Sequence, residues 1–212
     1  MKKLSLLLAA LLLLVCCGCA PGEYAQVAAT TLPVYEFTAR LCEGTDITVT
    51  RLVTESVSCL HDYSLNVDQV RSVEAAEVVV ISGAGMEEFM EDVLADKPAI
   101  DASHGIDLIE GGHELDHEHE HEEESHEGHH HEEDPHIWLS PANAKIMAEN
   151  ICAGLCDQYP DHADTFAANL ELLLTDLDEL QTYGGAQLAN LSCRELITFH
   201  DGFAYFADAF GL

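Results

Sequence analysis

The stretch Glu77-Val78-Val79-Val80-Ile81-Ser82 is a short, uninterrupted run of β-branched apolar residues between polar ones. A run of this kind predicts a strand that is covered on both faces, as strands of a parallel sheet are. Helices and strands alternate around it, which predicts an α/β fold with helices on both faces of the sheet. Ligands of such folds bind beyond the carboxyl ends of the strands. The other expected strands lie at 26–31, 46–53 and 99–101. Helices are expected at 33–42 and 86–94, and a further helix is expected to end at 75 and to begin after an N-cap at either Ser64 or Asn66.

The composition changes abruptly at residues 110–134, which hold eight His, twelve Asp or Glu and no Lys or Arg. We expect a mobile loop there, because so charged a segment cannot bury a core. Beyond it, helices are expected from Pro141 to about 156 and at 161–183, the second ended by Gly184-Gly185. The apolar stripe of the second helix consists of Phe166, Leu170, Leu173, Leu177 and Leu180.

A strand at 196–199 and a helix at 203–210 are expected to close the sequence. One strand and one helix cannot form a sheet by themselves. The sequence therefore predicts one αβ lobe, a linking helix and the start of a second lobe that is incomplete in this chain, as in a fragment of a longer protein.

The N-terminus has the pattern of a secretory signal peptide, with Lys2 and Lys3 before an apolar run at 6–17 that is too short to span a bilayer. The ending Val15-Cys16-Cys17-Gly18-Cys19 resembles a bacterial lipobox, which predicts that Cys19 is acylated. We expect an exported protein, lipid-anchored to the outer side of the cytoplasmic membrane or periplasmic. The expected organisation is signal peptide 1–18, linker 19–24, αβ lobe 25–112, His/Glu-rich loop 113–133, end of that lobe 134–160, linking helix 161–183 and start of the second lobe 184–212.

The chain is strongly acidic, with 39 Asp and Glu against 8 Lys and Arg and a formal net charge of −31. Nucleic acid is therefore an unsuitable partner, because binding to phosphates requires Lys and Arg. The cysteines after the signal peptide form no C-x2-C pair, which argues against a zinc-finger type of site. The sequence leaves open the disulfide pairing of Cys42, Cys59, Cys152, Cys156 and Cys193.

Three histidines stand where loops are expected to follow structured elements. They are His61 in Cys59-Leu60-His61-Asp62-Tyr63, His136 in Asp134-Pro135-His136-Ile137-Trp138-Leu139-Ser140-Pro141, and His200 in Thr198-Phe199-His200-Asp201-Gly202-Phe203. A neutral imidazole is a good ligand for Zn²⁺. The nearest carboxylates, which either orient these rings or remain solvated loop charges, are Asp62, Asp134 and Asp201.

With Val27-Ala28-Ala29-Thr30-Thr31-Leu32-Pro33, the lipobox and the histidine-rich insertion, these motifs resemble the zinc- or manganese-binding solute-binding lipoproteins of bacterial ABC transporters. The resemblance covers nearly all of residues 25–212. It implies two αβ lobes joined by one long rigid helix, with the metal held between them by His61, His136, His200 and a fourth ligand from beyond residue 212. His200 stands where manganese-binding members have Glu, which favours Zn²⁺ over Mn²⁺.

The resemblance further implies a monomeric binding protein, not an enzyme, that delivers Zn²⁺ to a membrane permease powered by a cytoplasmic ATPase. A manganese-binding member of the same family is the first alternative. The second is an exported zinc hydrolase that uses the three histidines, with Asp201 as a general base.

The histidine-rich loop has two interpretations of its own. Its imidazoles among carboxylates form many weak, exchangeable sites that capture zinc near the cleft, or the loop is a solvated acidic linker. A zinc buffer that works through the loop alone is a third possible function. The histidines concerned are His113, His117, His119, His121, His126, His129, His130 and His131.

Overall fold

The computed structural model describes residues 24–54, 60, 63–110 and 133–212. Its centre is a four-stranded sheet in the order β2-β1-β3-β4, in which all neighbouring strands are parallel. The expected α/β class with a parallel sheet is thereby confirmed. The strands are β1 (Val27–Ala29), β2 (Val49–Arg51), β3 (Val78–Ile81) and β4 (Ala99–Asp101).

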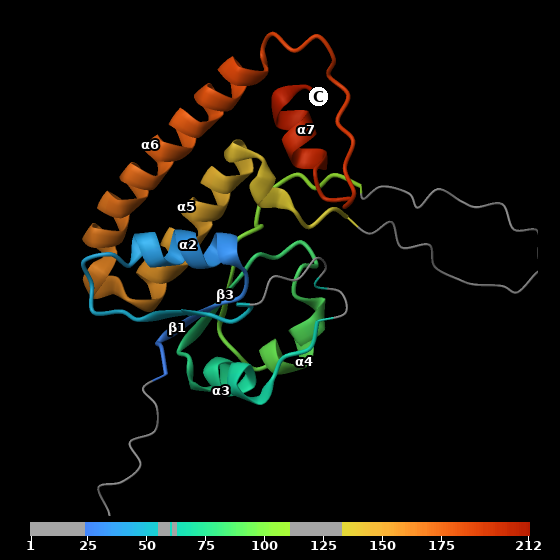
Figure 1. Ribbon diagram of the computed structural model, residues 1–212. Helices are drawn as coiled ribbons and strands as arrows, with labels where there is room; N and C mark the ends of the chain where they lie inside the picture. Colours follow the sequence, from blue (N-terminus) through green and yellow to red (C-terminus); the bar gives the residue numbers. More distant parts are fainter. Residues whose placement is uncertain (1–23, 55–59, 61–62, 111–132) are drawn as a thin grey trace, which may run out of the picture.

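Helices cover both faces of this sheet (Figure 1). On one face lie α2 (Leu32–Leu41) and α5 (Pro141–Gln158), with α6 (Ala163–Leu188) packed on them, and on the other lie α3 (Val67–Ala75) and α4 (Glu91–Leu94). Side chains of a strand alternate between the faces. In β3, for example, Val78 and Val80 join the core under α2 and α5, whereas Val79 joins the core with α3. The last helix, α7 (Ala204–Phe210), contacts α6.

The start of α3 follows from a local hydrogen-bond pattern. Asn66 is the N-cap, and its side-chain oxygen accepts hydrogen bonds from the amides of Asp68 and Gln69, both at 3.0 Å. In return the Gln69 side chain accepts a hydrogen bond from the Asn66 amide at 2.8 Å. This reciprocal capping box satisfies amides that a helix start leaves without partners. Of the two expected caps, Asn66 is therefore the one used.

The helix expected at residues 86–94 is wrong in its first half. Regular α4 begins only at Glu91, after a short 3-10 turn at Glu88–Met90. The cause is Glu87, which is 5% exposed because its side chain folds back onto the end of β3. The backbone must turn to allow this, and helical geometry starts after the turn.

Glu87 is a buried carboxylate at the carboxyl ends of two strands. It accepts hydrogen bonds from the amides of Ser82 (2.7 Å) and Gly83 (3.0 Å) and from the Thr30 hydroxyl (2.5 Å). Burial raises the pKa of Glu87 from 4.5 to about 7, although these hydrogen bonds lower it, and the charge of Asp101 raises it further. Glu87 thus joins the ends of β1 and β3 while resisting ionisation.

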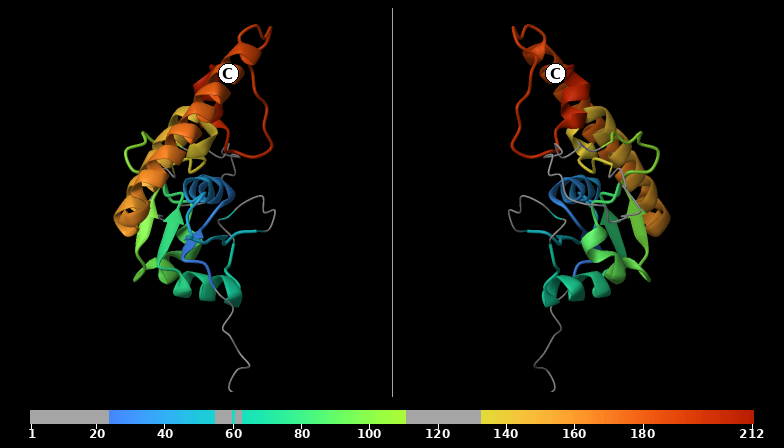
Figure 2. Two further views of the ribbon diagram at one scale, coloured as in Figure 1. Left: turned by 90° about the vertical axis from the view of Figure 1, so that its left-hand side faces the viewer. Right: turned by 90° about the vertical axis from the view of Figure 1, so that its right-hand side faces the viewer.

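The expected end of the long helix at Gly184-Gly185 is also wrong, because α6 continues to Leu188. A Cβ added at Gly184 would lie 2.5 Å from ring atoms of Phe210 in α7. The glycine therefore permits a close approach of two helices and does not mark a helix end. With 26 residues, α6 is about 39 Å long at about 1.5 Å per residue, and it projects beyond the αβ unit (Figure 2).

The inner face of α6 is fixed to the lobe by both apolar and polar contacts. Phe166, Leu173 and Leu177 are buried, whereas Leu180 at the end of the expected stripe is 52% exposed. Ion pairs join Arg40 of α2 to Asp176 at 2.7 Å and Lys145 of α5 to Asp178 at 2.6 Å. None of the helices in the described part of the chain has the length and apolar character needed to cross a bilayer.

The strand expected at 196–199 is absent from the described residues, since 196–198 have no regular structure and 199–200 form a bend. Its apolar side chains have no neighbouring strand to pack against, and Ile197 is 88% exposed.

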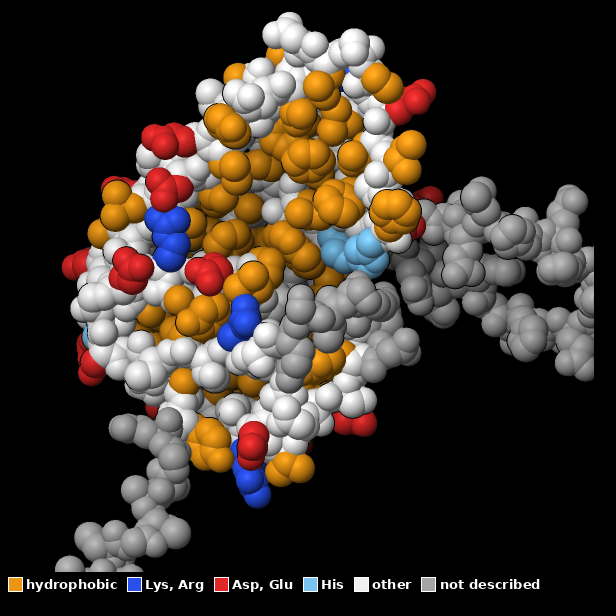
Figure 3. Space-filling view, viewed as in Figure 1, with side chains coloured by type: hydrophobic (Ala, Val, Ile, Leu, Met, Phe, Trp, Pro, Cys, Tyr) orange, Lys and Arg blue, Asp and Glu red, His pale blue; other side chains and the backbone are white. Residues whose placement is uncertain are grey.

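Apolar side chains also gather on the face that α6 and α7 present in Figure 3. Large exposed apolar patches usually mark a site of contact with another protein surface, a membrane or a ligand. The exposed large apolar residues of this half of the chain are Leu172, Leu180, Tyr183, Leu191, Leu196, Ile197, Phe199 and Phe203.

Candidate metal site

His136 is fixed in place by its immediate neighbours in the sequence. It is followed by a 3-10 turn, Ile137–Leu139, and by α5, whose first turn is capped by the Ser140 side chain. Ile137 is fully buried and anchors the turn in the core. The imidazole therefore stands on a short, packed connection at the start of a helix, which restricts its position.

Asp134 orients the His136 ring. One carboxylate oxygen, Oδ1, accepts a hydrogen bond from the His136 amide at 2.9 Å and lies 2.7 Å from ring nitrogen Nδ1. When Nδ1 carries the proton, Nε2 presents its lone pair on the opposite side of the ring. A ring held this way is prepared to bind a metal through Nε2.

Asp134 is 4% exposed, so its charge needs local compensation. Burial raises the pKa of Asp134, but the hydrogen bonds from the His136 ring and amide, the His136 charge and the Ala204 amide lower it, and the net direction is downward. The carboxylate is therefore kept ionised beside the ring that it orients. The expected interaction of Asp134 with a site histidine is present in the structure.

His200 lies directly against His136, although 64 residues separate them. Their Nε2 atoms are 3.1 Å apart, and the two rings meet edge to face with centroids at 4.9 Å. His200 is exposed, and histidine side chains border the apolar region in Figure 3. The structure thus brings together two of the three histidines that the sequence singles out.

Gly202 belongs to this site, although sequence reasoning missed it. A Cβ at this position would lie 2.8 Å from both Cε1 and Nδ1 of His136. The backbone that follows His200 therefore packs directly against the face of the other imidazole. A glycine permits a close approach of backbone, but the sequence does not show which side chain it approaches.

Trp138 is the only tryptophan of the chain, and its ring centroid lies 5.3 Å from that of His136. It packs partly buried against the main core. Its fluorescence should therefore respond to any change at the His136 ring.

Of the other predicted site residues, only Asp201 lies in the described part of the chain. Asp201 is exposed, and within the described residues it makes no hydrogen bond or ion pair with either histidine. His61, Asp62, Cys19 and the eight histidines of the loop lie outside the described residues. Across residues 24–54, 60, 63–110 and 133–212, no three His, Cys, Asp or Glu side chains are arranged to hold a metal ion.

The cysteines in the described part of the chain are all free thiols: Cys42, Cys152, Cys156 and Cys193. Cys59 lies outside it. Burial raises the pKa of the Cys42 and Cys152 thiols to about 12, and the neighbouring Cys156 adds to the effect at Cys152. Thiols in this state are poor metal ligands, because the thiolate is the binding form.

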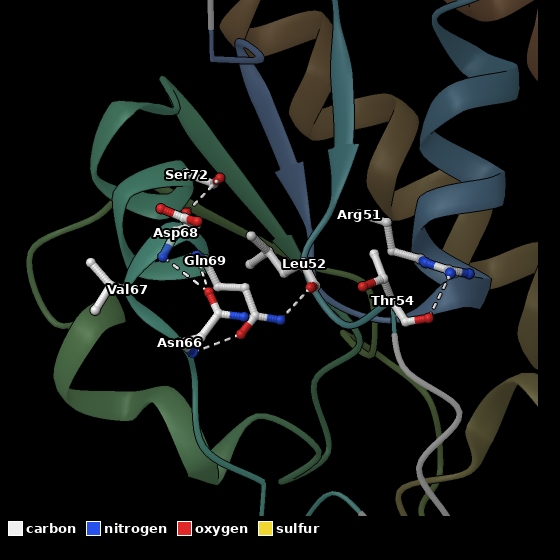
Figure 4. Close-up of a pocket in the computed structure, with 8 residues that line it drawn as sticks. All are labelled: Arg51, Leu52, Thr54, Asn66, Val67, Asp68, Gln69 and Ser72. Atoms are coloured by element: carbon white, nitrogen blue, oxygen red, sulfur yellow. Dashed lines mark hydrogen bonds between the residues drawn. The ribbon is translucent and has the colours of Figure 1, made fainter. Parts of the chain in front are cut away.

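Both sides of the segment that carries His61 are held by Gln69 of α3. Its side-chain nitrogen donates hydrogen bonds to the Leu52 carbonyl and to the Tyr63 hydroxyl, both at 2.7 Å. A hollow of about 450 Å³ lies beside it, between the end of β2 and the start of α3 (Figure 4). The Gln69 side chain thus fixes the distance between the residues that precede and follow His61.

Known proteins resemble this chain in sequence and in fold. Over the whole chain it is 34% identical to the zinc-binding lipoprotein AdcA of Streptococcus pneumoniae, of which it covers 43%. Over 90% of the chain it is 33% identical to the high-affinity zinc uptake system protein ZnuA of Bacillus subtilis, of which it covers 60%. The crystal structure of Zn(II)-bound AdcA from Streptococcus pneumoniae superimposes with a TM-score of 0.72 at 27% identity, over 90% of this chain and 38% of that one.

The chain therefore spans less than half of the length of AdcA. The family model described as zinc-uptake complex component A, periplasmic (ZnuA), matches residues 27–212, which include both histidines of the pair. On this match the chain belongs to the family of the periplasmic zinc-uptake component ZnuA.

Proposed function

We propose that this protein captures Zn²⁺ outside the cytoplasm and delivers it to an ABC-type importer. His136 and His200 hold the ion together with His61, and the receiver is a membrane permease powered by a cytoplasmic ATPase. Zinc is the cargo in this proposal, so the protein is a binding protein and not an enzyme. Membership of the zinc-uptake family supports the transport role.

The observation that carries the proposal is the separation of the two imidazole nitrogens. Two nitrogens that bind one tetrahedral zinc at about 2.05 Å lie about 3.3 Å apart. The Nε2 atoms of His136 and His200 are 3.1 Å apart. Zinc therefore needs only a small separation of the rings to bind between them.

The protonation of the pair is suited to a cation. Asp134 accepts from Nδ1 of His136, so Nε2 of that ring has its lone pair free. Without a metal, the short contact requires His200 to donate its own Nε2 proton to that lone pair. Zinc replaces this proton, because a metal ligand must be deprotonated.

The ligand type favours Zn²⁺ over Mn²⁺. Imidazole nitrogen suits zinc, whereas manganese prefers sites rich in oxygen. Both ligands in the described part of the site are nitrogens. The relatives AdcA and ZnuA carry zinc in their names, which agrees with this choice.

The segments outside the described residues complete the proposal. Acylated Cys19 would hold the protein, as a monomer, on the outer side of the cytoplasmic membrane. Asp62 would orient His61 as Asp134 orients His136. Histidines of the 113–133 loop would collect zinc at many weak sites, and this capture would weaken as the pH falls through about 6.5 and the imidazoles gain protons.

The lobe organisation is part of the proposal. We place a first αβ lobe at 25–112 and 134–160, and the start of a second at the segment from residue 184, which carries His200. The helix α6 connects them. His136 precedes this helix in the chain and His200 follows it. Zinc binding by both would therefore depend on how the two lobes are placed relative to each other.

The test is a zinc titration of the chain from residue 20 in competition with a chelator of known affinity, followed by Trp138 fluorescence. Loss of a residue that only orients a ligand lowers metal affinity by up to roughly 100-fold. His136→Ala and His200→Ala each remove a ligand itself and should lower the zinc affinity by more than that. His104→Ala, which removes an exposed imidazole elsewhere, is the matched control and should bind as the wild type does.

Replacement of residues 113–131 by a Gly/Ser linker separates the two kinds of zinc site. One tight site should survive this replacement and disappear in His136→Ala. If tight binding instead disappears with the loop and persists in both histidine variants, the protein is a zinc buffer and the proposed function is wrong.

A further inference from the structure

Tyr205 of α7 makes a long-range contact that the metal site itself does not explain. Its side chain is 3% exposed and belongs to the main core. Its hydroxyl accepts a hydrogen bond from the Ile109 amide at 3.0 Å, across 96 residues of sequence. The hydroxyl of a buried tyrosine usually has a hydrogen-bond partner. Here the partner is Ile109, in a connection that leads to the metal site.

Ile109 is joined directly to the residue that orients His136. The Ile109 carbonyl accepts a hydrogen bond from the Asp134 amide at 2.8 Å. The next pair outward, Glu110 and Glu133, forms an antiparallel bridge. Ile109 is thus held on one side by Tyr205 and on the other by Asp134.

A continuous series of hydrogen bonds therefore connects α7 with the His136 ring. It runs from the Tyr205 hydroxyl to the Ile109 amide, from the Ile109 carbonyl to the Asp134 amide, and from the Asp134 carboxylate to Nδ1 of His136. Each step is directional, so a shift of α7 would be transmitted to the carboxylate.

His200 depends on the same helix. It lies five residues before Tyr205, in the segment that leads into α7. The position of α7 thus affects His200 through the chain and His136 through the hydrogen bonds. From this arrangement we propose that Tyr205 is a positioning residue for zinc binding, whose hydroxyl fixes the separation of the His136 and His200 nitrogens.

This inference rests on the proposed function, since it assumes that zinc binds to this histidine pair. The hydroxyl, and not only the ring, carries the role. Packing of the ring keeps α7 in the core but permits small sliding movements, whereas the hydrogen bond fixes one register. Its loss would leave the Ile109 amide without its partner.

The contact should operate over the whole pH range of a binding experiment. Burial raises the pKa of Tyr205, the nearby carboxylates of Asp134 and Glu133 raise it further, and the bond from Ile109 lowers it. The net direction is upward, so the phenol stays neutral at and above neutral pH. A pH-dependent loss of affinity at or below neutral pH would therefore not come from Tyr205.

The variant that tests the proposal is Tyr205→Phe, which keeps the ring and removes only the hydroxyl. Tyr183→Phe in α6, where the tyrosine is 64% exposed, is the matched control. Both are compared with the wild type by competitive zinc titration, by the visible absorption spectrum of bound Co²⁺ and by urea unfolding of the metal-free protein.

We expect Tyr205→Phe to bind zinc about 10-fold more weakly, at the lower end of the effect of removing a partner that orients a ligand. The Co²⁺ spectrum should change in intensity, because the tetrahedral arrangement is distorted. The urea midpoint of the metal-free protein should fall slightly, because the Ile109 amide loses its partner, and the Co²⁺ spectrum separates this loss from a change at the site. Tyr183→Phe should match the wild type in all three measurements.

Wild-type affinity with a wild-type Co²⁺ spectrum in Tyr205→Phe would overturn the proposal. So would a loss of affinity that only follows a lower urea midpoint, with the spectrum unchanged, because that pattern belongs to a purely structural residue. The proposed function would fail if the wild type had no tight zinc site, or if His136→Ala did not remove that site. This result is distinct from the results above, which overturn only the role of Tyr205.

Hydrogen exchange supplies a test that needs no variant. In the wild-type protein the Ile109 amide should exchange slowly with deuterium, and more slowly still when zinc is bound. Exchange at the rate of a free amide in both states would contradict the role of Tyr205.

Discussion

Substitution of Gly202 by alanine gives the sharpest test of the site geometry. The added Cβ would lie 2.8 Å from Cε1 and Nδ1 of His136, whereas ordinary contact begins near 3.4 Å, so something must move by 0.6 Å. The His136 ring cannot turn away freely, because Asp134 holds its Nδ1. If the backbone moves instead, it carries His200 with it, so either adjustment separates the two Nε2 atoms.

The magnitude follows from the tolerance of a metal site. Zinc–ligand distances vary by only about 0.2 Å, so a movement of 0.6 Å exceeds what the ligands can absorb. We expect the zinc affinity to fall about 10- to 100-fold, which is about 1.4 to 2.8 kcal/mol. Competitive titration with a chelator measures the affinity, and Trp138 fluorescence reports the displacement of the ring.

The matched control is Gly185→Ala, because a Cβ at Gly185 meets nothing within 4 Å. Gly185 lies inside α6, so alanine there should stabilise the helix by up to about 1 kcal/mol without affecting zinc. Wild-type zinc affinity in Gly202→Ala would refute the reasoning, since it would show that neither ring nor backbone limits the site.

Three further predictions concern residues around the site and the sheet. Asp134→Asn should lower the zinc affinity about 10- to 100-fold in the same titration, because the amide lacks the charge that supports the His136 ring; an unchanged affinity would contradict its orienting role. Gln69→Met should lower the free energy of urea unfolding by about 1 to 3 kcal/mol, because the Leu52 carbonyl loses its donor. Gln69→Met should also weaken zinc binding, because Gln69 holds Leu52 and Tyr63 on the two sides of the segment that carries His61. A free energy of unfolding equal to that of the wild type would show that the Gln69 hydrogen bonds contribute nothing to stability. Burial raises the pKa of Glu87 to about 7. The contribution of its neutral form to the free energy of unfolding is therefore fully present below pH 4.5 and is lost as the pH rises through 7. Between pH 5 and pH 8 the urea stability of the wild type relative to Glu87→Gln should therefore fall by about 2.5 kcal/mol, and a constant difference would mean that Glu87 ionises normally.

The elements predicted best are those that local chemistry determines. The apolar run of β3 and the cap at Asn66 depend on neighbouring residues, so both could be predicted from the sequence. The Asp134–His136 contact is similar, since only Pro135 separates the two residues on one short connection. The meeting of His136 with His200 depended instead on the family resemblance, because nothing local relates residues 64 positions apart.

The errors arose where a distant part of the chain decides the local structure. Gly184-Gly185 indicated a helix end, but the reason for Gly184 is Phe210, which packs against it from another helix. Residues 86–94 had a helical pattern, but Glu87 is drawn to the end of β3. A strand was expected at 196–199, but it has no partner strand among the described residues. Gly202 and Tyr205 were missed for the same reason, because their contacts become visible only after folding.

The position of β1 has a mechanical consequence. It is the first strand of the described chain, and it runs between two parallel neighbours, β2 and β3. If the protein is tethered through Cys19, any pulling force enters the fold along β1 and loads the hydrogen bonds of both its edges in shear, all at once. Within the described sheet β2 is attached only to β1, so a force that extracts β1 would also detach the strand that leads to His61.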